Sequence, residues 1–138
     1  INGAVSVPAV PVMLEKAYAR QLLCGHDLAI DCLDNPRARM LLENSCEALG
    51  LPFVHGAVSG DAGQVAVVLP GDGLMKRLYS GWETGGTPPG GNPVFSVQIV
   101  SALQISEALK LLVGRDSGLR GKLLHINLSD YSFALIQA

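Results

Sequence analysis

The sequence predicts an α/β protein in which parallel strands in the first half are followed by a mixed, partly antiparallel sheet in the second half. Strand-like and helix-like segments alternate over residues 5–50, which is typical of a parallel sheet. From residue 51 onward, pairs of short apolar runs are separated only by turn residues. So short a connection forces the two strands of each pair to run antiparallel.

Length and composition indicate one domain with a single core. The chain has 138 residues, of which 49% are hydrophobic and 16% charged, and this length is too short for two ordinary domains. The formal net charge of −2 provides no basic field for nucleic acid or a membrane surface. The cysteines show no C-x-x-C spacing and lie in apolar surroundings, so we expect a reducing, cytosolic compartment.

The first elements alternate between strand and helix. Residues 5–12 predict an edge strand or an extended entry segment, because Pro8 and Pro11 cannot donate backbone hydrogen bonds. Residues 14–23 have helical spacing, and residues 26–33 predict a buried parallel strand.

The next helix has clear signals at both ends. Asn35 is a natural N-cap and Pro36 a natural first helical residue. Apolar residues then recur on one face as far as Gly50, which predicts a helix over residues 36–49.

We predict one pair of strands over residues 51–60 and 63–70. We predict a terminal hairpin over residues 122–128 and 132–138. Residues 94–113 are apolar, but polar side chains interrupt them at helical spacing, so a core helix is the better interpretation than a membrane span.

That long helix is predicted to begin at the Asn92–Pro93 pair, as N-cap and first helical residue. The glycine-rich and proline-rich segment 71–93 before it is the least regular part of the chain. We expect it to be a lid or a partner-binding loop.

Asp34 is the strongest candidate site residue. It follows a predicted parallel strand and precedes a helix, where ligands bind in open α/β sheets and where free N–H groups attract anions. A carboxylate here could hold Mg²⁺, which would carry a nucleotide's phosphates, and Arg37 and Arg39 could add bidentate donors. The alternative is that Asp34 and Asn35 only cap the helix and that the arginines are solvated.

The other polar residues are weaker candidates. Three histidines have no metal-ligand partner at short spacing and are expected to be structural or exposed: His26, His55 and His125. Three cysteines lie in apolar runs and are not expected to form reactive thiolates: Cys24, Cys32 and Cys46. The chain contains no G-x-S-x-G, G-x-G-x-x-G or P-loop motif.

Taken together, residues 26–73 resemble the middle of the ThiF/MoeB/HesA family, the bacterial relatives of ubiquitin-activating enzymes. That family has a strand ending in D-x-x-D-N, an arginine four residues later, and a hairpin with conserved Pro, Gly-Ala and Gly-x-Val positions. The matching residues here are Asp31, Asp34, Asn35, Arg39, Pro52, His55, Gly56, Ala57, Gly63, Gln64 and Val65. Residues 100–114 and 121–136 resemble the family's long helix and closing hairpin.

The resemblance implies an incomplete Rossmann-like three-layer domain. It also implies ATP-dependent adenylation of the C-terminal carboxylate of a ubiquitin-like sulfur-carrier protein, of the thiamine or molybdopterin biosynthesis type. Asp34 would be the catalytic and Mg²⁺-binding residue, with Asn35 and Arg39 in the nucleotide pocket. Residues 71–93 would be the crossover loop over the partner's tail. Family members are usually homodimers.

Three departures qualify this expectation. The family's G-x-G-G-x-G loop precedes the part of the pattern found here, so we expect residues 1–138 to be a C-terminal fragment that is inactive alone. Met75 and Leu78 replace a zinc-binding C-x-x-C pair, so zinc is not expected. Residues 71–93 contain no cysteine, which favours adenylation without thiol transfer.

Two other functions remain alternatives. One is a non-catalytic binding or dimerisation module that has lost nucleotide chemistry. The other, ranked last, is a nicotinamide-dependent dehydrogenase, which would lack its glycine fingerprint and leave the antiparallel half unexplained.

Overall fold

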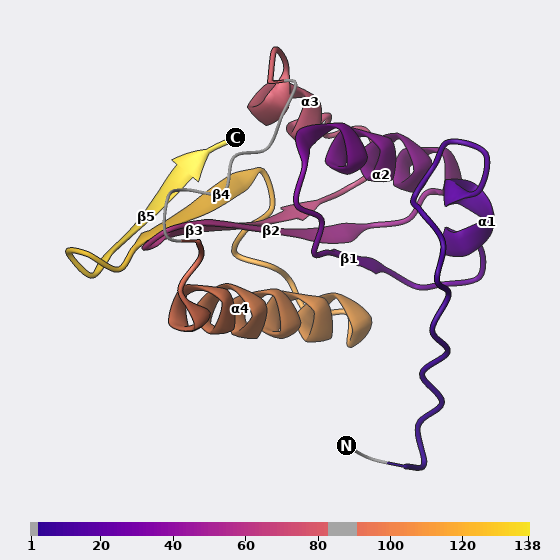
Figure 1. Ribbon diagram of the computed structural model, residues 1–138, viewed down its shortest axis with the longest axis horizontal. Coiled ribbons are helices and arrows are strands. Elements are labelled where there is room, and N and C mark those ends of the chain that lie inside the picture. The colour runs from indigo at the N-terminus through magenta and orange to yellow at the C-terminus, as the bar shows by residue number, and fades with distance from the viewer. Residues whose placement is uncertain (1–2, 83–90) are drawn as a thin grey trace.

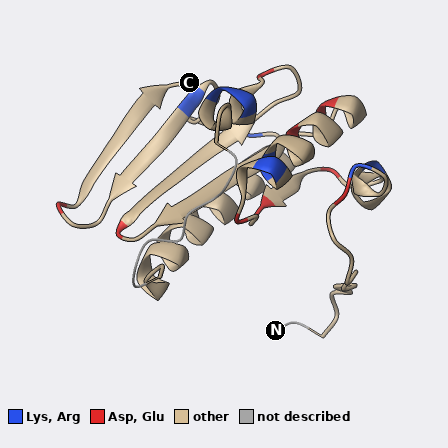
Figure 2. Cartoon of the chain, turned by 45° about the horizontal axis from the view of Figure 1, so that its top comes forward, with Lys and Arg blue, Asp and Glu red and all other residues tan. Residues whose placement is uncertain are grey.

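A mixed sheet forms the centre of the protein, with helices on both faces (Figure 1). The computed structural model describes residues 3–82 and 91–138. The described strands form a five-stranded sheet in the order β1-β2-β3-β4-β5, which Figure 2 shows from a second direction. Their bounds are Ala29–Asp31 (β1), Phe53–Ser59 (β2), Ala62–Val68 (β3), Lys122–Asn127 (β4) and Ser132–Gln137 (β5). β1 and β2 are parallel and the later neighbours antiparallel, which confirms the fold class predicted from the sequence.

The helices form the outer two layers. α1 (Ala19–Leu23), α2 (Pro36–Leu49) and α3 (Leu74–Tyr79) lie on one side of the sheet, and α4 (Val94–Leu112) lies on the other (Figure 1). By length and composition alone α4 could cross a membrane, but one side of it packs on the sheet through Val100 and Ala108.

The ends of α2 match the sequence prediction to the residue. The Asn35 side chain accepts a hydrogen bond of 2.8 Å from the Ala38 N–H, and Pro36 is the first helical residue. Gly50 ends the helix in the left-handed conformation, with φ of 65°, which costs glycine less than any other residue. This cap fixes where the chain turns from β1 into α2.

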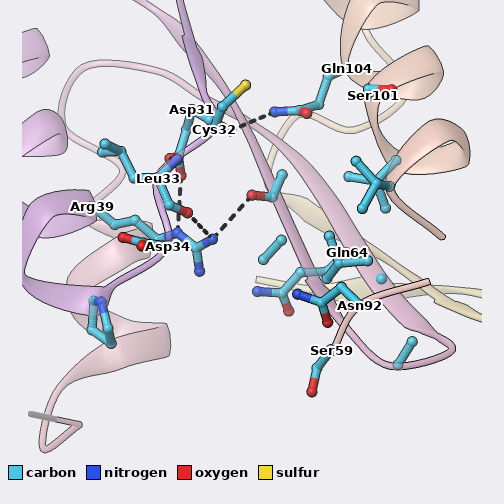
Figure 3. A pocket seen from close by; sticks show the side chains of 18 of the residues that line it. Asp31, Cys32, Leu33, Asp34, Arg39, Ser59, Gln64, Asn92, Ser101 and Gln104 are labelled. Carbon is cyan, nitrogen blue, oxygen red and sulfur yellow. Dashed lines mark hydrogen bonds and ion pairs between the residues drawn. The ribbon is translucent and has the colours of Figure 1, made fainter. Parts of the chain in front are cut away.

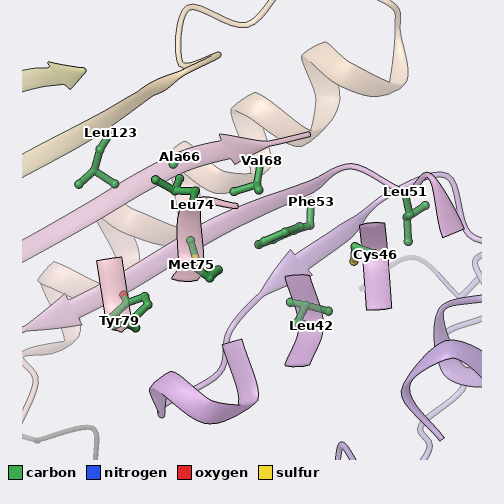
Figure 4. Close-up of a cluster of buried hydrophobic side chains, with 10 residues drawn as sticks. All are labelled: Leu42, Cys46, Leu51, Phe53, Ala66, Val68, Leu74, Met75, Tyr79 and Leu123. Carbon is green, nitrogen blue, oxygen red and sulfur yellow. The ribbon is translucent and has the colours of Figure 1, made fainter. Parts of the chain in front are cut away.

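Alternation along the strands divides the core between the two faces of the sheet. Phe53 and Ala66 face α2 and α3, and Val54 and Val65 face α4 (Figure 4 shows the first cluster). Full burial of a side chain such as Phe53 contributes about 1.5–3 kcal/mol. The layers are therefore held to the sheet from both sides, and the polar residues between them are placed with little freedom.

The N-terminal predictions were wrong in part. Residues 6–15 form neither strand nor helix, and the first helix begins at Ala19 rather than at residue 14. Val7 remains 82% exposed. The two prolines, Pro8 and Pro11, cannot donate to a strand neighbour, so the apolar run stays extended.

Residues 71–93 are more regular than predicted, because they contain α3. The Glu43 carboxylate of α2 accepts hydrogen bonds from the Met75 and Lys76 N–H groups, at 2.8 and 3.1 Å. These bonds satisfy backbone donors at the start of α3, which otherwise lack partners. Residues 83–90 lie outside the described residues, so the crossover-loop interpretation stays a prediction.

The predicted start of α4 was wrong by one residue. Pro93 is the N-cap and makes no side-chain cap hydrogen bond. The Asn92 side chain instead accepts a hydrogen bond of 3.0 Å from the Gly60 N–H in the β2–β3 turn. This contact ties the approach to α4 to the end of the central hairpin.

Candidate functional site

A cavity of about 500 Å³ opens where β1 ends and the chain turns toward α2. Its wall includes Asp31 and Asp34 from this corner, small residues such as Gly56 and Gly63 from the central hairpin, and Gln104 from α4 (Figure 3). The cavity therefore lies at the carboxyl end of a parallel strand, where the sequence predicted a site.

Asp34 is exposed in the cavity wall. Its Oδ1 accepts a hydrogen bond of 3.0 Å from the Asn35 side-chain amide, whereas Asn35 itself caps α2. Asn35 is therefore the cap, and the Asp34 carboxylate faces the cavity without acting as the cap.

The N-terminus of α2 has fewer free N–H groups for an anion than its position in the fold suggested. Pro36 has no N–H, the Ala38 N–H bonds to the Asn35 side chain, and the Arg39 N–H bonds to the Asn35 carbonyl. Most first-turn donors are therefore already used. The exposed carboxylate of Asp34, rather than the helix end, is the feature that suits a ligand.

Arg39 is buried, and its guanidinium is bound to the protein. One terminal nitrogen donates to the Tyr79 hydroxyl at 2.8 Å, and the other to the carbonyls of Leu33 and Gly56, at 2.5 and 3.3 Å. Figure 3 shows the Arg39 side chain beside Leu33 and Asp34. Arg39 borders the cavity but acts as a clamp between the corner and β2. Arg37 is exposed.

A polar network of mostly buried side chains forms part of the cavity wall and extends behind it. The Asp31 carboxylate is 2.6 Å from His55 Nδ1, and His55 Nε2 is 3.2 Å from the Tyr79 hydroxyl and 3.1 Å from the Gln64 amide nitrogen. Gln64 also donates to Tyr79 at 2.7 Å. Asp31 and His55 are fully buried.

Burial is the largest influence on the protonation of this network. It lowers the pKa of His55, although the Asp31 hydrogen bond and charge act in the opposite direction. Burial also raises the pKa of Tyr79, despite the opposing Arg39 charge. Both groups are therefore neutral near pH 7, and Asp31 is held by His55 and by the Arg39 Nε at 3.5 Å.

The other sequence candidates take different positions. His26 is exposed, and His125 is half-buried in the cavity wall on β4. No local sequence signal indicated the role of His55, although its position two residues after Phe53 predicted that both lie on the same face of β2.

The thiols are poorly suited to nucleophilic chemistry. Burial, followed by the charge of Asp31, raises the pKa of Cys32. Burial, followed by the charges of Asp31 and Glu43, raises the pKa of Cys46 to about 11. Cys32 lines the cavity but is predominantly a thiol near pH 7.

Metal binding at the corner would depend on ligands from outside the protein. Within residues 3–82 and 91–138, no three His, Cys, Asp or Glu side chains are grouped so that they could hold one metal ion. A single carboxylate such as Asp34 fits Mg²⁺, which commonly binds one or two carboxylates and takes its remaining oxygens from water and phosphate.

The three-layer fold, with a cavity beside the end of a parallel strand, defines a Rossmann-like domain. Sequence comparison gives the family: the ThiF family model matches residues 1–138. The chain belongs to the ThiF family.

Its curated relatives include adenylyltransferases. The chain is 36% identical to the sulfur carrier protein adenylyltransferase of Thermus thermophilus, covering 96% of the chain and 53% of that protein. It is 30% identical to the molybdopterin-synthase adenylyltransferase of Escherichia coli (90% and 51%) and 29% identical to the SAMP-activating enzyme E1 of Haloferax volcanii (99% and 52%). The chain thus spans about half the length of these relatives.

Solved structures share the fold at low sequence identity. The E. coli MccB structure with ATP matches with a TM-score of 0.71 and 14% identity, covering 99% of the chain and 43% of that chain. PaaA matches with a TM-score of 0.60 and 14% identity, covering 94% and 46%. These matches show the architecture alone.

Proposed function

We propose that this chain forms the C-terminal part of an ATP-dependent adenylyltransferase that activates the C-terminal carboxylate of a ubiquitin-like sulfur-carrier protein. The observation that carries the proposal is the exposed carboxylate of Asp34 in the cavity at the carboxyl end of β1. The names of the ThiF-family relatives support the reaction class. The thiamine and molybdopterin pathways are the proposed setting.

In this reaction the acceptor carboxylate attacks the α-phosphate and pyrophosphate leaves, so the protein must align the reactants and neutralise charge. Mg²⁺, when bound, would supply that charge neutralisation. Asp34 would hold the ion, and Asn35 would keep the Asp34 carboxylate oriented through their 3.0 Å hydrogen bond. Arg39 would border the nucleotide pocket while it holds the corner in place. A complete site also needs the nucleotide-binding glycine loop, which the matched part of the pattern does not include.

We also propose that the complete protein is a cytosolic homodimer. Large apolar side chains recur on the outward face of α4 and are at least half exposed: Val94, Ile105, Leu109 and Leu112. Such a face is typical of a surface that is covered by another chain. Sedimentation of the complete protein tests this arrangement.

Pyrophosphate exchange by the complete protein with its ubiquitin-like partner tests the role of Asp34. Asp34→Asn should lower exchange at least about 100-fold, with little change in stability because the side chain is exposed. Asp116→Asn is the matched control, because it changes an 85% exposed aspartate that does not line the cavity, and it should leave exchange unchanged. Unchanged exchange in Asp34→Asn would refute this role.

The same assay separates the enzyme from a non-catalytic binding module. The use of most first-turn donors of α2 within the protein is the observation that favours the module. A module would bind the ubiquitin-like partner but show no exchange in the wild-type protein.

A further inference from the structure

The buried chain Asp31–His55–Tyr79 ends on Arg39, the residue that clamps the corner before Asp34. Three elements supply it: β1 carries Asp31, β2 carries His55 and α3 carries Tyr79. The chain leads from a fully buried carboxylate to a hydroxyl at the cavity wall. Nothing in local sequence spacing connects these residues.

The donors and acceptors fit one arrangement of protons. The Asp31 carboxylate only accepts hydrogen bonds, so the His55 nitrogen 2.6 Å from it, Nδ1, carries a proton. In the neutral ring Nε2 then accepts, and the Tyr79 hydroxyl at 3.2 Å and the Gln64 amide at 3.1 Å both lie within donor distance of it. The Tyr79 oxygen accepts from Arg39 at 2.8 Å and from the Gln64 amide at 2.7 Å, which leaves the Tyr79 hydroxyl proton directed at Nε2.

The last link joins this chain to the site. Arg39 also donates to the Leu33 carbonyl, which lies one residue before Asp34, and to the Gly56 carbonyl of β2. Since the guanidinium is planar and rigid, fixing one of its nitrogens constrains the other. The direction of the Tyr79 hydroxyl therefore affects where the corner is held.

We propose that His55 and Tyr79 are positioning residues for the adenylation site, which hold Arg39 and, through Arg39, the corner bearing Asp34. The expected loss of turnover rests on the proposed function. The expected loosening of the corner does not. His55 does not line the cavity and Tyr79 only borders it, and neither residue is proposed to bond to the nucleotide. Their loss should therefore reduce turnover more than nucleotide binding.

Tyr79→Phe is the main test, because it removes one hydroxyl and keeps the buried ring. In pyrophosphate exchange by the complete protein, kcat should fall about 10- to 100-fold, with little change in KM for ATP. Tyr131→Phe, which removes a hydroxyl from an 82% exposed side chain, is the matched control and should have no effect. Unchanged kcat in Tyr79→Phe, in an active wild-type protein, would overturn the proposal.

Two further measurements do not depend on activity. Nitrogen NMR of the histidines should show His55 protonated on Nδ1, with an Nε2 resonance that changes in Tyr79→Phe but not in Tyr131→Phe. Hydrogen exchange at the Leu33 amide, next to the clamped carbonyl, should become about 10-fold faster in Tyr79→Phe, while exchange at Val67 in the sheet stays unchanged. His55 protonated on Nε2, or an unchanged Leu33 amide, would overturn the proposal.

Conservative variants separate the two links of His55. His55→Gln keeps an acceptor near the Nε2 position, and His55→Asn keeps a donor near the Nδ1 position. Turnover and Leu33 exchange should be rescued more by Gln than by Asn, because the link to Tyr79 is the one that reaches the corner. If both variants changed turnover and Leu33 exchange equally, His55 would have only a packing role. If the wild type shows no exchange activity while the NMR results hold, the proposed function fails and the positioning arrangement stands.

Discussion

Replacing Gly56 with alanine should disrupt the contact that joins α4 to the site. A Cβ built at Gly56 would lie 2.3 Å from Cδ of Gln104, and the three nearest atoms all belong to the Gln104 side-chain amide. Gln104 would have to move, and its amide nitrogen now donates to the carbonyls of Asp31 and Val54, at 2.8 and 3.2 Å. Gly56→Ala should therefore break two buried hydrogen bonds in which Gly56 itself takes no part.

The size of the effect follows from those two bonds. Each buried hydrogen bond contributes about 1 kcal/mol, so the free energy of unfolding should fall by about 2 kcal/mol. For a chain of this length, that corresponds to a decrease in Tm of about 6–10 °C. Gly118→Ala is the matched control, because nothing lies within 4 Å of its added Cβ; its stability should change by less than about 1 kcal/mol.

Urea unfolding of a double-mutant cycle isolates the cause. Gln104→Ala already lacks both hydrogen bonds, so adding Gly56→Ala to it should cost close to nothing, with a coupling energy of about 2 kcal/mol. If Gly56→Ala costs the same with and without Gln104, the explanation is wrong and the loss has another source.

Two further predictions concern buried charge and protonation. Because burial lowers the pKa of His55, its contribution to stability is complete above the unfolded pKa of about 6.5 and is lost as the pH falls through that value toward the folded pKa. Urea midpoints measured from about pH 8 to about pH 5 should fall less in His55→Gln than in the wild type; an equal fall assigns the dependence to other groups. Glu43→Gln should cost about 1.5–3 kcal/mol, because a charged acceptor of two N–H groups at the start of α3 is lost. Unfolding should show this loss while the exposed control Glu47→Gln stays within about 0.5 kcal/mol, and equal values would contradict it.

The sequence predicted best the features that depend on neighbouring residues. Asn35, Pro36 and Gly50 set the ends of α2 through local backbone chemistry, and the structure agrees to the residue. Short turns between apolar runs likewise specified the antiparallel pairs. The location of Asp34 at the carboxyl end of β1 followed from the order of the elements.

Features that depend on distant residues could not be predicted. α3 is a short helix in a segment rich in glycine, and its first N–H groups are satisfied by Glu43, 32 residues earlier. The Arg39–Tyr79 hydrogen bond spans 40 residues. Sequence spacing placed Arg39 near a ligand, whereas tertiary packing gave its donors to the protein.

The unpaired edge of β1 indicates the side from which a further strand and its loop would approach the candidate site. Among the described strands, β1 pairs only with β2, so its other edge still has backbone donors and acceptors to offer. A strand added there in parallel would end at the same edge of the sheet as β1, because parallel strands have their carboxyl ends on one side. The loop following such a strand would then meet Asp34 from the side opposite the central hairpin, and a ligand held between them would be enclosed by both.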